Sequence, residues 1–407
     1  MPSRGYDITL LGASGYTGRL VGAYLSRALA ASKSSPARWA IAGRNRAKLE
    51  EIASAFEGTR PDIVVVDVDS KEGVARLAGD TRVLCSTAGP YDVLGRGVVA
   101  ACAAQGTHYC DITGEVPFVR HSIDTHHDEA IRTKARIVHC CGFDSVPSDI
   151  GVYLLQKEAL LRFGAPLHRV DFVVLKTRGG FSGGTAQSLI GVLDAASRDP
   201  EAMRSITDPY GLSPKGTTGN DRDASTWKKS PFRGVPGYVA PFFMGPVNAR
   251  VVRRSNALLE ELYGFDFRYR EWMCTGKGAK GYATAAGLTV GMGALFTLGQ
   301  EKATRRLLAR WFPKSGEGPT KEQRESGFYR IRLFGTRNEE ASLDLRVEGD
   351  QDPGYGDTAK MLGESALALA YDDLPENYGV VTPAYAMGDA LAARLRAAGI
   401  RFELETP

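Results

Sequence analysis

Short apolar runs alternate with helical patterns through the first third of the chain. Residues 7–11 form an apolar run, and the apolar residues between 20 and 29 then recur at helical spacing. Further apolar runs occupy residues 39–42, 63–66, 83–86, 108–111 and 137–140, with helical patterns at 93–105 and 122–134. Strand and helix repeating at intervals of about 25–30 residues predict an α/β fold, a Rossmann-type doubly wound parallel sheet with right-handed crossovers.

The pattern changes after residue 150 to longer strands separated by loops. Expected strands lie at 170–176, 328–334 and 342–348, and expected helices at 150–161, 189–196, 358–371 and 384–398. We therefore predict a nucleotide-binding domain over residues 1–150 and a second α+β domain, built on a largely antiparallel sheet, over 151–374. Residues 375–407, including a short strand at 400–404, are expected to return to the first domain. Residues 208–237 are rich in Pro, Gly, Ser and Thr and are expected to form a mobile surface excursion.

A glycine motif, GASGYTG at residues 12–18, stands between the first strand and the first helix. In this context Gly12 permits the tight turn, Gly15 lets the backbone approach a pyrophosphate, and Gly18 lets the helix pack close to the sheet. The free N–H groups of the helix N-terminus attract phosphate. The predicted cofactor-binding residues of this motif are Gly12, Ser14, Gly15, Tyr16, Thr17 and Gly18.

The end of the second strand indicates which dinucleotide binds. An NAD enzyme usually places Asp or Glu here, whereas an arginine accommodates the 2′-phosphate of NADP. This chain has Arg44 and Arg46 and no acid at that point. The alternative is that both arginines only solvate the start of the next helix. We expect NADP(H), with both arginines as ligands.

Other loops at the carboxyl ends of the strands complete the predicted site. Asp67 follows the third strand and is expected to flank the adenine. The loop 87–91 follows the fourth strand and is expected beside the nicotinamide, with Thr87, Gly89 and Pro90 as cofactor ligands. Asp144 and Ser145 lie in a later polar loop at the same rim.

Composition and charge exclude several classes of protein. The chain has 407 residues and a net charge of +4 spread over both halves, so nucleic-acid binding is not expected. Its six cysteines form no metal or disulfide pattern, and we expect no metal site. An apolar run beginning at Asp7 leaves no room for a signal peptide, so a reducing, cytoplasmic location is expected.

The segment 281–314 combines an uncharged stretch with a basic one. Residues 281–300 carry no charge but consist mostly of Gly, Ala and Thr, which argues against a membrane span. The basic residues that follow are interleaved with apolar ones: Lys302, Arg305, Arg306, Arg310 and Lys314. Three interpretations stay open, namely peripheral contact with a membrane or lipid droplet, a lid over an acyl channel, and a plain surface helix.

The motifs resemble the saccharopine dehydrogenase-like oxidoreductases over nearly the whole chain. They are GASGYTG (12–18), AGR (42–44), GPY (89–91), DITGE (111–115), CGFDSVPSD (141–149) and TPAYAMGDAL (382–391). Within that family, the segments 197–212 and 248–264 are most similar to the trans-acting enoyl reductases of phthiocerol-type lipid biosynthesis. This resemblance implies NADPH-dependent reduction of an α,β-unsaturated acyl or polyketide thioester, held on CoA or a carrier protein. A homo-oligomer is also expected.

The chemistry of such a reduction assigns hypothetical catalytic roles. Negative charge that develops on the thioester oxygen needs a hydrogen-bond donor, and the α-carbon needs a proton. Tyr91 is the expected acid because it follows the loop beside the nicotinamide. Ser145, or N–H groups near Gly142, would hold the oxyanion, with Asp144 orienting them. A purely structural role for each of these residues stays open.

Three other functions stay open at this stage. An imine or saccharopine-type reductase would need a cluster of arginines for a dicarboxylate, and Arg250, Arg253 and Arg254 lie together, although they also suit a phosphopantetheine or carrier-protein contact. A lipid-surface protein that keeps a nucleotide fold would use 281–314 as its anchor. An NADP(H)-sensing regulator would bind the cofactor and reduce nothing.

Overall fold

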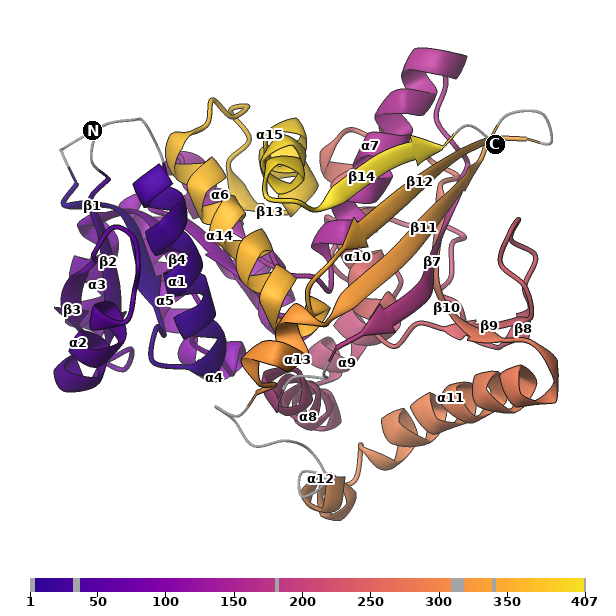
Figure 1. Cartoon of the computed structure of the whole chain (residues 1–407), viewed down its shortest axis with the longest axis horizontal. Coiled ribbons are helices and arrows are strands. Elements are labelled where there is room, and N and C mark those ends of the chain that lie inside the picture. The colour runs from indigo at the N-terminus through magenta and orange to yellow at the C-terminus, as the bar shows by residue number, and fades with distance from the viewer. Residues whose placement is uncertain (1–3, 32–36, 180–182, 309–317, 339–341, 406–407) are drawn as a thin grey trace.

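Two β-sheets organise the residues that the computed structural model describes, which are 4–31, 37–179, 183–308, 318–338 and 342–405. The first sheet is on the left of Figure 1 and the second on the right, with helices between and around them. One continuous hydrophobic core includes side chains from both sheets, such as Leu10 from the first and Leu333 from the second. The two sheets therefore share a core.

The first sheet is parallel throughout, as predicted. Its strands are β1 (Tyr6–Leu11), β2 (Trp39–Gly43), β3 (Asp62–Val65), β4 (Thr81–Ser86), β5 (His108–Asp111), β6 (Arg136–Val138) and β13 (Gly379–Val381). Their spatial order is β13-β6-β5-β4-β1-β2-β3. The connecting helices are α1 (Tyr16–Ala31), α2 (Arg46–Ser54), α3 (Lys71–Gly79), α4 (Tyr91–Leu94), α5 (Arg96–Gln105) and α6 (Val116–Arg132). This order places the chain reversal between β1 and β4, the crevice where such sheets bind nucleotides.

The second sheet is mixed and largely antiparallel, which confirms the predicted fold class. It contains β7 (Arg169–Arg178), β8 (Lys228–Lys229), β9 (Tyr238–Pro241), β10 (Arg268–Gly276), β11 (Phe328–Thr336), β12 (Ser342–Gly349) and β14 (Arg401–Glu405). Their order is β14-β12-β11-β7-β10-β9-β8, and within the described part of this second sheet only β7 and β10 pair in parallel.

The remaining helices join and flank the two sheets (Figure 1). They are α7 (Val146–Phe163), α8 (Gly183–Arg198), α9 (Pro200–Thr207), α10 (Gly245–Leu258), α11 (Gly278–Leu298), α12 (Lys302–Leu308), α13 (Lys321–Glu325), the π-helical turn η1 (Pro353–Asp357), α14 (Thr358–Tyr371) and α15 (Pro383–Ala397). Helix α7 contacts β11, β12, α10 and α15. It leaves the carboxyl edge of the first sheet and ends against the second.

The path of the C-terminus corrects one expectation. The strand at 400–404 was expected to return to the first domain, but β14 pairs antiparallel with β12, with Val347 opposite Phe402. The strand that joins the first sheet is β13, which pairs with β6. The alternating pattern of 400–404 suits an edge strand with one exposed face, whereas the three residues of β13 are all buried.

Two other segments differ from their expected positions. Helix α14 was assigned to the second domain, but it packs on α1, β1, β4 and β5 of the first sheet. Nearly all its side chains are buried, which explains an apolar composition on every side. Residues 208–237 contain the short strand β8 and are anchored by a buried ion pair between Asp221 and Arg253, with N–O distance 2.8 Å. That anchor argues against a mobile excursion.

Candidate functional site

The glycine turn after β1 is held in a fixed shape by the loop after β4. Gly12 has φ +88°, a conformation that side-chain-bearing residues rarely adopt. Thr87 donates from Oγ1 to the carbonyl oxygens of Leu11 and Gly12, both at 3.2 Å. A Cβ on Gly12 would lie 2.9 Å from the nitrogen of Ala88. Gly12 therefore serves the turn, as expected, and Thr87 supports it.

The other two glycines of the motif have different surroundings. A Cβ on Gly18 would lie 2.2 Å from the carbonyl oxygen of Gly12, so Gly18 allows α1 to pack against the turn. A Cβ on Gly15 would meet only that same oxygen, at 3.4 Å, and Gly15 is exposed. Ser14 and Thr17 beside it are partly exposed. The chain is therefore open at Gly15, where a pyrophosphate is expected to approach the N-terminus of α1.

A distant part of the chain packs on the side chain of Tyr16, the first residue of α1. The ring of Tyr16 packs edge-on against that of Tyr355, with 4.7 Å between ring centroids. Its hydroxyl donates to the carbonyl of Pro319 and accepts from the guanidinium of Arg324, on α13. These contacts could not be predicted from the sequence, because they join residues more than 300 positions apart.

The end of β2 presents an arginine suited to a phosphate. Arg44 is exposed, and its guanidinium forms no ion pair or hydrogen bond with another described residue. Arg46 is also exposed and forms a loose pair with Glu50, with an N–O distance of 3.7 Å. Asp67 is exposed after β3, and its contact with the adenine stays a prediction. Arg44 thus has the freer guanidinium for a 2′-phosphate.

Tyr91 is part of the protein core. Its hydroxyl donates to the carbonyl of Ser86 at 3.2 Å, and its side chain is 5% exposed. Burial raises the pKa of the Tyr91 phenol well above its ordinary value, and the nearby charge of Asp111 raises it further. These contacts argue against the acid role expected from the sequence. Gly89 and Pro90 precede it, in the loop that begins with Thr87.

A buried glutamate that the sequence analysis did not single out organises the same loop. Glu115 accepts hydrogen bonds from the N–H groups of Tyr91, at 3.0 Å, and Asp92, at 2.8 Å. Its carboxylate also accepts from the hydroxyl of Ser188 on α8, at 2.8 Å. Burial raises the pKa of Glu115, although these three donors oppose the shift. A single carboxylate therefore connects the β4 loop to α8.

The loops after β5 and β6 are joined by Asp111. Its carboxylate accepts from Nδ1 of His139 at 2.7 Å and from the backbone N–H of Cys140 at 3.2 Å. It also accepts from the N–H of Thr113 at 3.1 Å. Asp111 and His139 are both buried. This pair positions the loop that carries Asp144 and Ser145.

Ser145 belongs to a buried hydrogen-bond network shared with the second domain. Its hydroxyl donates to Oδ1 of Asn248 at 3.1 Å, and Asn248 donates from Nδ2 to Glu271 at 2.9 Å. Glu271 also accepts from the hydroxyls of Ser148, at 2.7 Å, and Tyr269, at 2.6 Å. Burial raises the pKa of Glu271 to about 7. The hydroxyl of Ser145 is thus used to position the loop.

Asp144 differs from the other two expected catalytic residues in its exposure. It is partly exposed, whereas Tyr91 and Ser145 are buried. Burial of the carboxyl nonetheless raises the pKa of Asp144 to about 6. A carboxyl group with such a pKa can hold and release a proton near neutral pH.

The arginine cluster on α10 is structural. Arg250, Arg253 and Arg254 are each 2–3% exposed. Arg253 pairs with Asp221 and Asp223, both at 2.8 Å, and Arg250 pairs with Asp223 at 2.9 Å. The cluster is therefore not open to a dicarboxylate substrate or a carrier protein.

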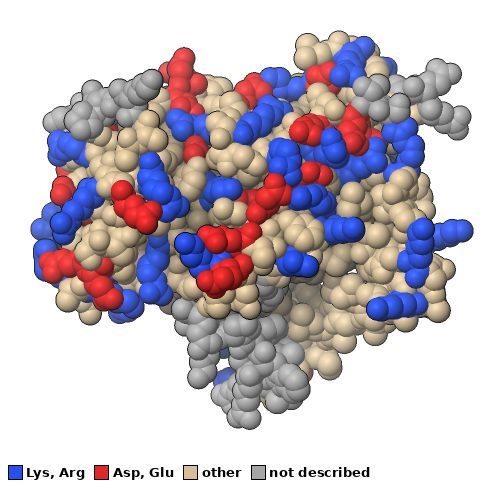
Figure 2. Space-filling model, viewed as in Figure 1, with Lys and Arg blue, Asp and Glu red and all other residues tan. Residues whose placement is uncertain are grey.

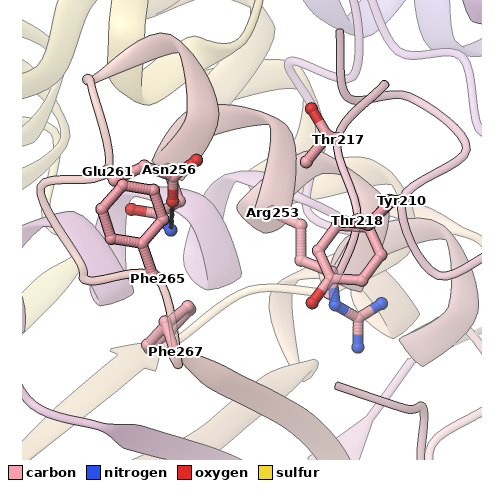
Figure 3. Close-up of a pocket in the computed structure, with 8 residues that line it drawn as sticks. All are labelled: Tyr210, Thr217, Thr218, Arg253, Asn256, Glu261, Phe265 and Phe267. Atoms are coloured by element: carbon pink, nitrogen blue, oxygen red, sulfur yellow. Dashed lines mark hydrogen bonds between the residues drawn. The ribbon is translucent and has the colours of Figure 1, made fainter. Parts of the chain in front are cut away.

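A small pocket lies beside this cluster (Figure 3). Its volume is about 30 Å³, room for little more than a water molecule. Figure 3 shows Asn256 bonded to Glu261 on one side and Tyr210 beside Arg253 on the other. This pocket is too small for a dinucleotide or an acyl chain.

Helix α11 lies on the outside of the molecule, at the lower right of Figure 1. Within the described part of the chain it is the one helix that has the length and the apolar composition needed to cross a membrane. Figure 2 shows a largely tan surface there, in contrast to the mixed charges elsewhere on that face. Residues 309–314 of the segment 281–314 lie outside the described residues.

Comparison with solved structures supports the fold. The chain is similar to apo saccharopine dehydrogenase (L-Glu forming) of Saccharomyces cerevisiae, with a TM-score of 0.53 and 11% identity over 99% of this chain and 100% of that one. It is also similar to a homospermidine synthase of Legionella pneumophila, with a TM-score of 0.52 and 10% identity over 100% of this chain and 92% of that one. At this identity the similarity concerns the fold alone.

Comparison of sequences shows the family. Residues 8–138 match the saccharopine dehydrogenase NADP binding domain, which makes the chain an NADP-dependent oxidoreductase. A Mycobacterium tuberculosis protein provisionally named trans-acting enoyl reductase is 42% identical over 98% of this chain and 97% of its own length. The trans-acting enoyl reductase of Mycobacterium bovis is 38% identical over the same shares. With this site and these relatives, the chain belongs to the trans-acting enoyl reductase family of saccharopine dehydrogenase-like oxidoreductases.

Proposed function

We propose that this chain reduces the double bond of an α,β-unsaturated acyl thioester carried by CoA or by a separate carrier protein. The observation that carries the proposal is the similarity to trans-acting enoyl reductases, which extends over 98% of the chain and includes both domains. A reductase that acts in trans takes its substrate from another protein. A polyketide or fatty acyl chain on a carrier domain fits that description.

The residues of the first sheet fit the cofactor. The turn 12–18 and the N-terminus of α1 would hold the pyrophosphate, and Arg44 would hold the 2′-phosphate. When bound there, NADPH supplies the hydride that the reduction requires. The open space at Gly15 supports this fit, and so does the exposed guanidinium of Arg44, which has no ion-pair partner among the described residues.

Asp144 is the group we assign to proton supply. Saturation of the double bond adds a hydride at the β-carbon and a proton at the α-carbon, and the thioester oxygen carries the negative charge in between. Protonated Asp144 would give its proton to the α-carbon and would then be reprotonated from water. Its pKa of about 6 keeps a useful fraction protonated near neutral pH. The network of Ser145, Asn248 and Glu271 holds the loop in place.

The test is turnover with defined thioesters. The purified chain is mixed with NADPH and 2-enoyl-CoA or 2-enoyl-pantetheine thioesters of increasing chain length, and cofactor oxidation is followed by absorbance. Mass spectrometry then identifies the saturated product, and the saturated thioester serves as the blank. Binding of NADPH without turnover of any enoyl thioester, free or carrier-bound, would contradict the proposal.

An imine reductase is less well supported by the structure. That activity would need accessible cations for a dicarboxylate, and the arginines that suggested it are buried and paired with Asp221 and Asp223. The same assay with an α-keto acid and an amine in place of the thioester distinguishes the two reactions. We expect no cofactor oxidation with that pair.

A further inference from the structure

Helix α11 leaves an unusually apolar surface uncovered. Of its described side chains only Gly281 and Ala285 are buried, whereas Val290 is 63% exposed and Leu298 is 55% exposed. Its threonines do not make the helix polar, because the hydroxyls of Thr289 and Thr297 donate to carbonyls of the preceding turn at 2.9 Å. A helix that is apolar on all sides is normally covered on all sides.

Both ends of α11 are fixed to the same body. At its start, Thr275 of β10 donates to the carbonyl of Gly281 at 2.9 Å. At its end, Arg305 donates to the carbonyl of Gly299 at 2.9 Å and pairs with Asp194 of α8 at 2.7 Å. A helix held at both ends in this way does not leave the body to cross a bilayer. Its even apolarity also differs from the polar and apolar faces of a helix that lies in a membrane surface.

The outward side of α11 is shaped for another helix. At helical spacing, Ala283, Gly287 and Ala294 lie on the side opposite the buried Gly281 and Ala285, and Gly291 lies next to Gly287 on the flank of that side. A Cβ added to Gly287 or Gly291 would meet no other atom within 4 Å. Small residues spaced in this way let two helix backbones approach closely.

The charges at the two ends complement each other. Lys277 and Lys280 lie at the N-terminus, where positive charge opposes the helix dipole, and Glu301 follows the C-terminus. All three are exposed, and none of them forms an ion pair with another described residue. In an antiparallel pair centred on residue 289, Lys277 of each copy faces Glu301 of the other. The same register places Gly287 opposite Gly291.

The available area is sufficient for a stable dimer. A helix of 21 residues is about 31 Å long, and with a diameter of about 10 Å it has roughly 1,000 Å² of lateral surface. The inward side of α11 already packs on β9 and β10, so a second helix can cover about half of this surface. In both copies together this removes on the order of 1,000 Å², about the least that a specific interface needs. We propose that α11 pairs with α11 of a second copy of this chain, antiparallel about a two-fold axis, to form a homodimer.

The primary test is the mass of the full chain in solution, measured by size-exclusion chromatography with light scattering. We expect twice 43.8 kDa for the wild type and 43.8 kDa for the double variant Gly287→Glu, Gly291→Glu. Gly97→Glu is the matched control, because Gly97 is also an exposed helical glycine with open space around it, and it lies on α5. That control stays dimeric. Circular dichroism and NADPH binding verify that each variant is folded.

A charge exchange tests the register. Lys277→Glu is expected to raise the dimer dissociation constant by roughly twofold to fivefold for each pair, and adding Glu301→Lys restores it. A wild-type chain that is monomeric at micromolar concentration, or a dimer that survives the double glutamate variant, overturns the proposal. A monomer that sediments with vesicles of phosphatidylcholine and phosphatidylglycerol overturns it in favour of a lipid surface.

Discussion

The hydroxyl of Ser145 donates to Oδ1 of Asn248 at 3.1 Å, which joins the loop after β6 to helix α10 of the second domain. Asn248 in turn donates to the buried carboxyl of Glu271 on β10. The position of Asp144, one residue before Ser145, is therefore set from the second domain. A change in the second sheet can reach the rim of the first through this contact.

Asp144 gives the clearest pH dependence. With its pKa raised to about 6, the carboxyl is protonated below that pH and can donate. We expect kcat/KM for an enoyl thioester to be level below about pH 6 and to fall tenfold for each pH unit above it. Asp144→Asn should lower the rate and remove this limb while NADPH affinity is retained. A variant that keeps the wild-type pH profile would exclude Asp144 as the acid.

Asp149 should make stability depend on pH in the opposite sense to most acidic residues. It is fully buried, and burial raises its pKa to about 7, above the value of about 3.9 expected in the unfolded chain. The folded state therefore binds more protons between these values, and its stabilisation is lost as the pH rises through 7. The effect is about 1.4 kcal/mol for each pKa unit.

Asp149→Asn tests this effect, because an asparagine can still accept from the N–H of Ala384 and bond to Ser255. Urea unfolding at about pH 5 and about pH 8 should show a larger loss of stability in the wild type than in the variant. Equal losses would mean that Asp149 is charged in both folded and unfolded states.

Substitutions at different glycines of the turn 12–18 should affect either the stability of the fold or the affinity for NADPH. Gly12→Ala and Gly18→Ala should lower the thermal midpoint, because their Cβ atoms would lie 2.9 Å and 2.2 Å from backbone atoms. Gly15→Ala should leave the midpoint unchanged and weaken NADPH binding, because its Cβ would occupy space intended for the pyrophosphate. Calorimetric titration and thermal unfolding measure the two effects. Equal NADPH affinity in Gly15→Ala and the wild type would show that the pyrophosphate does not bind beside Gly15.

Arg44 should determine the choice of NADPH over NADH. Its contact with a 2′-phosphate is worth about 1.5–3 kcal/mol, which corresponds to roughly 10- to 150-fold in affinity. Titration of NADPH and NADH into Arg44→Ala should show that this preference is lost. Arg46→Ala is the control, and we expect a smaller effect because Arg46 already pairs with Glu50. A larger loss in Arg46→Ala would reverse the two assignments.

The buried pair of Arg253 and Asp221 should be essential for the fold. Arg253→Met leaves Asp221 buried and unpaired, which typically costs about 3–5 kcal/mol. Urea unfolding measures this loss. The control is Arg132→Met, whose exposed pair with Glu129 should contribute about 1 kcal/mol or less. Similar values for the two variants would show that the α10 cluster does not hold residues 208–237.

The parallel sheet and the cofactor turn could be predicted because their signals are local. Gly12, Gly18 and Arg44 act through their own backbone conformation or their place at a strand end, which the order of residues reveals. The largely antiparallel second sheet could also be predicted, because the sequence after residue 150 shows long strands separated by loops. Helix α14 was assigned to the other domain because an apolar helix does not indicate which sheet it covers.

The catalytic rim was harder to predict because its contacts are long-range. Tyr91 is at the expected loop, but only the structure shows that its hydroxyl turns inward to Ser86. Glu115 gave no signal, because its partners Tyr91 and Ser188 lie 24 and 73 positions away. The arginines of α10 suggested an anion-binding site because no acidic partner lies near them in the sequence. Their partners Asp221 and Asp223 belong to the segment 208–237, which was expected to be mobile.

The last 30 residues of the chain give each sheet one of its edges, since β13 ends the first and β14 ends the second. Cutting the gene at the boundary near residue 150 would therefore leave the first fragment without its edge strand β13 and its covering helix α14, and the second fragment would carry both without their partners. The two halves form one cooperative unit, and we expect a single unfolding transition. Engineering that exchanges the substrate half with that of a relative must carry this C-terminal segment as a third piece, matched to both partners.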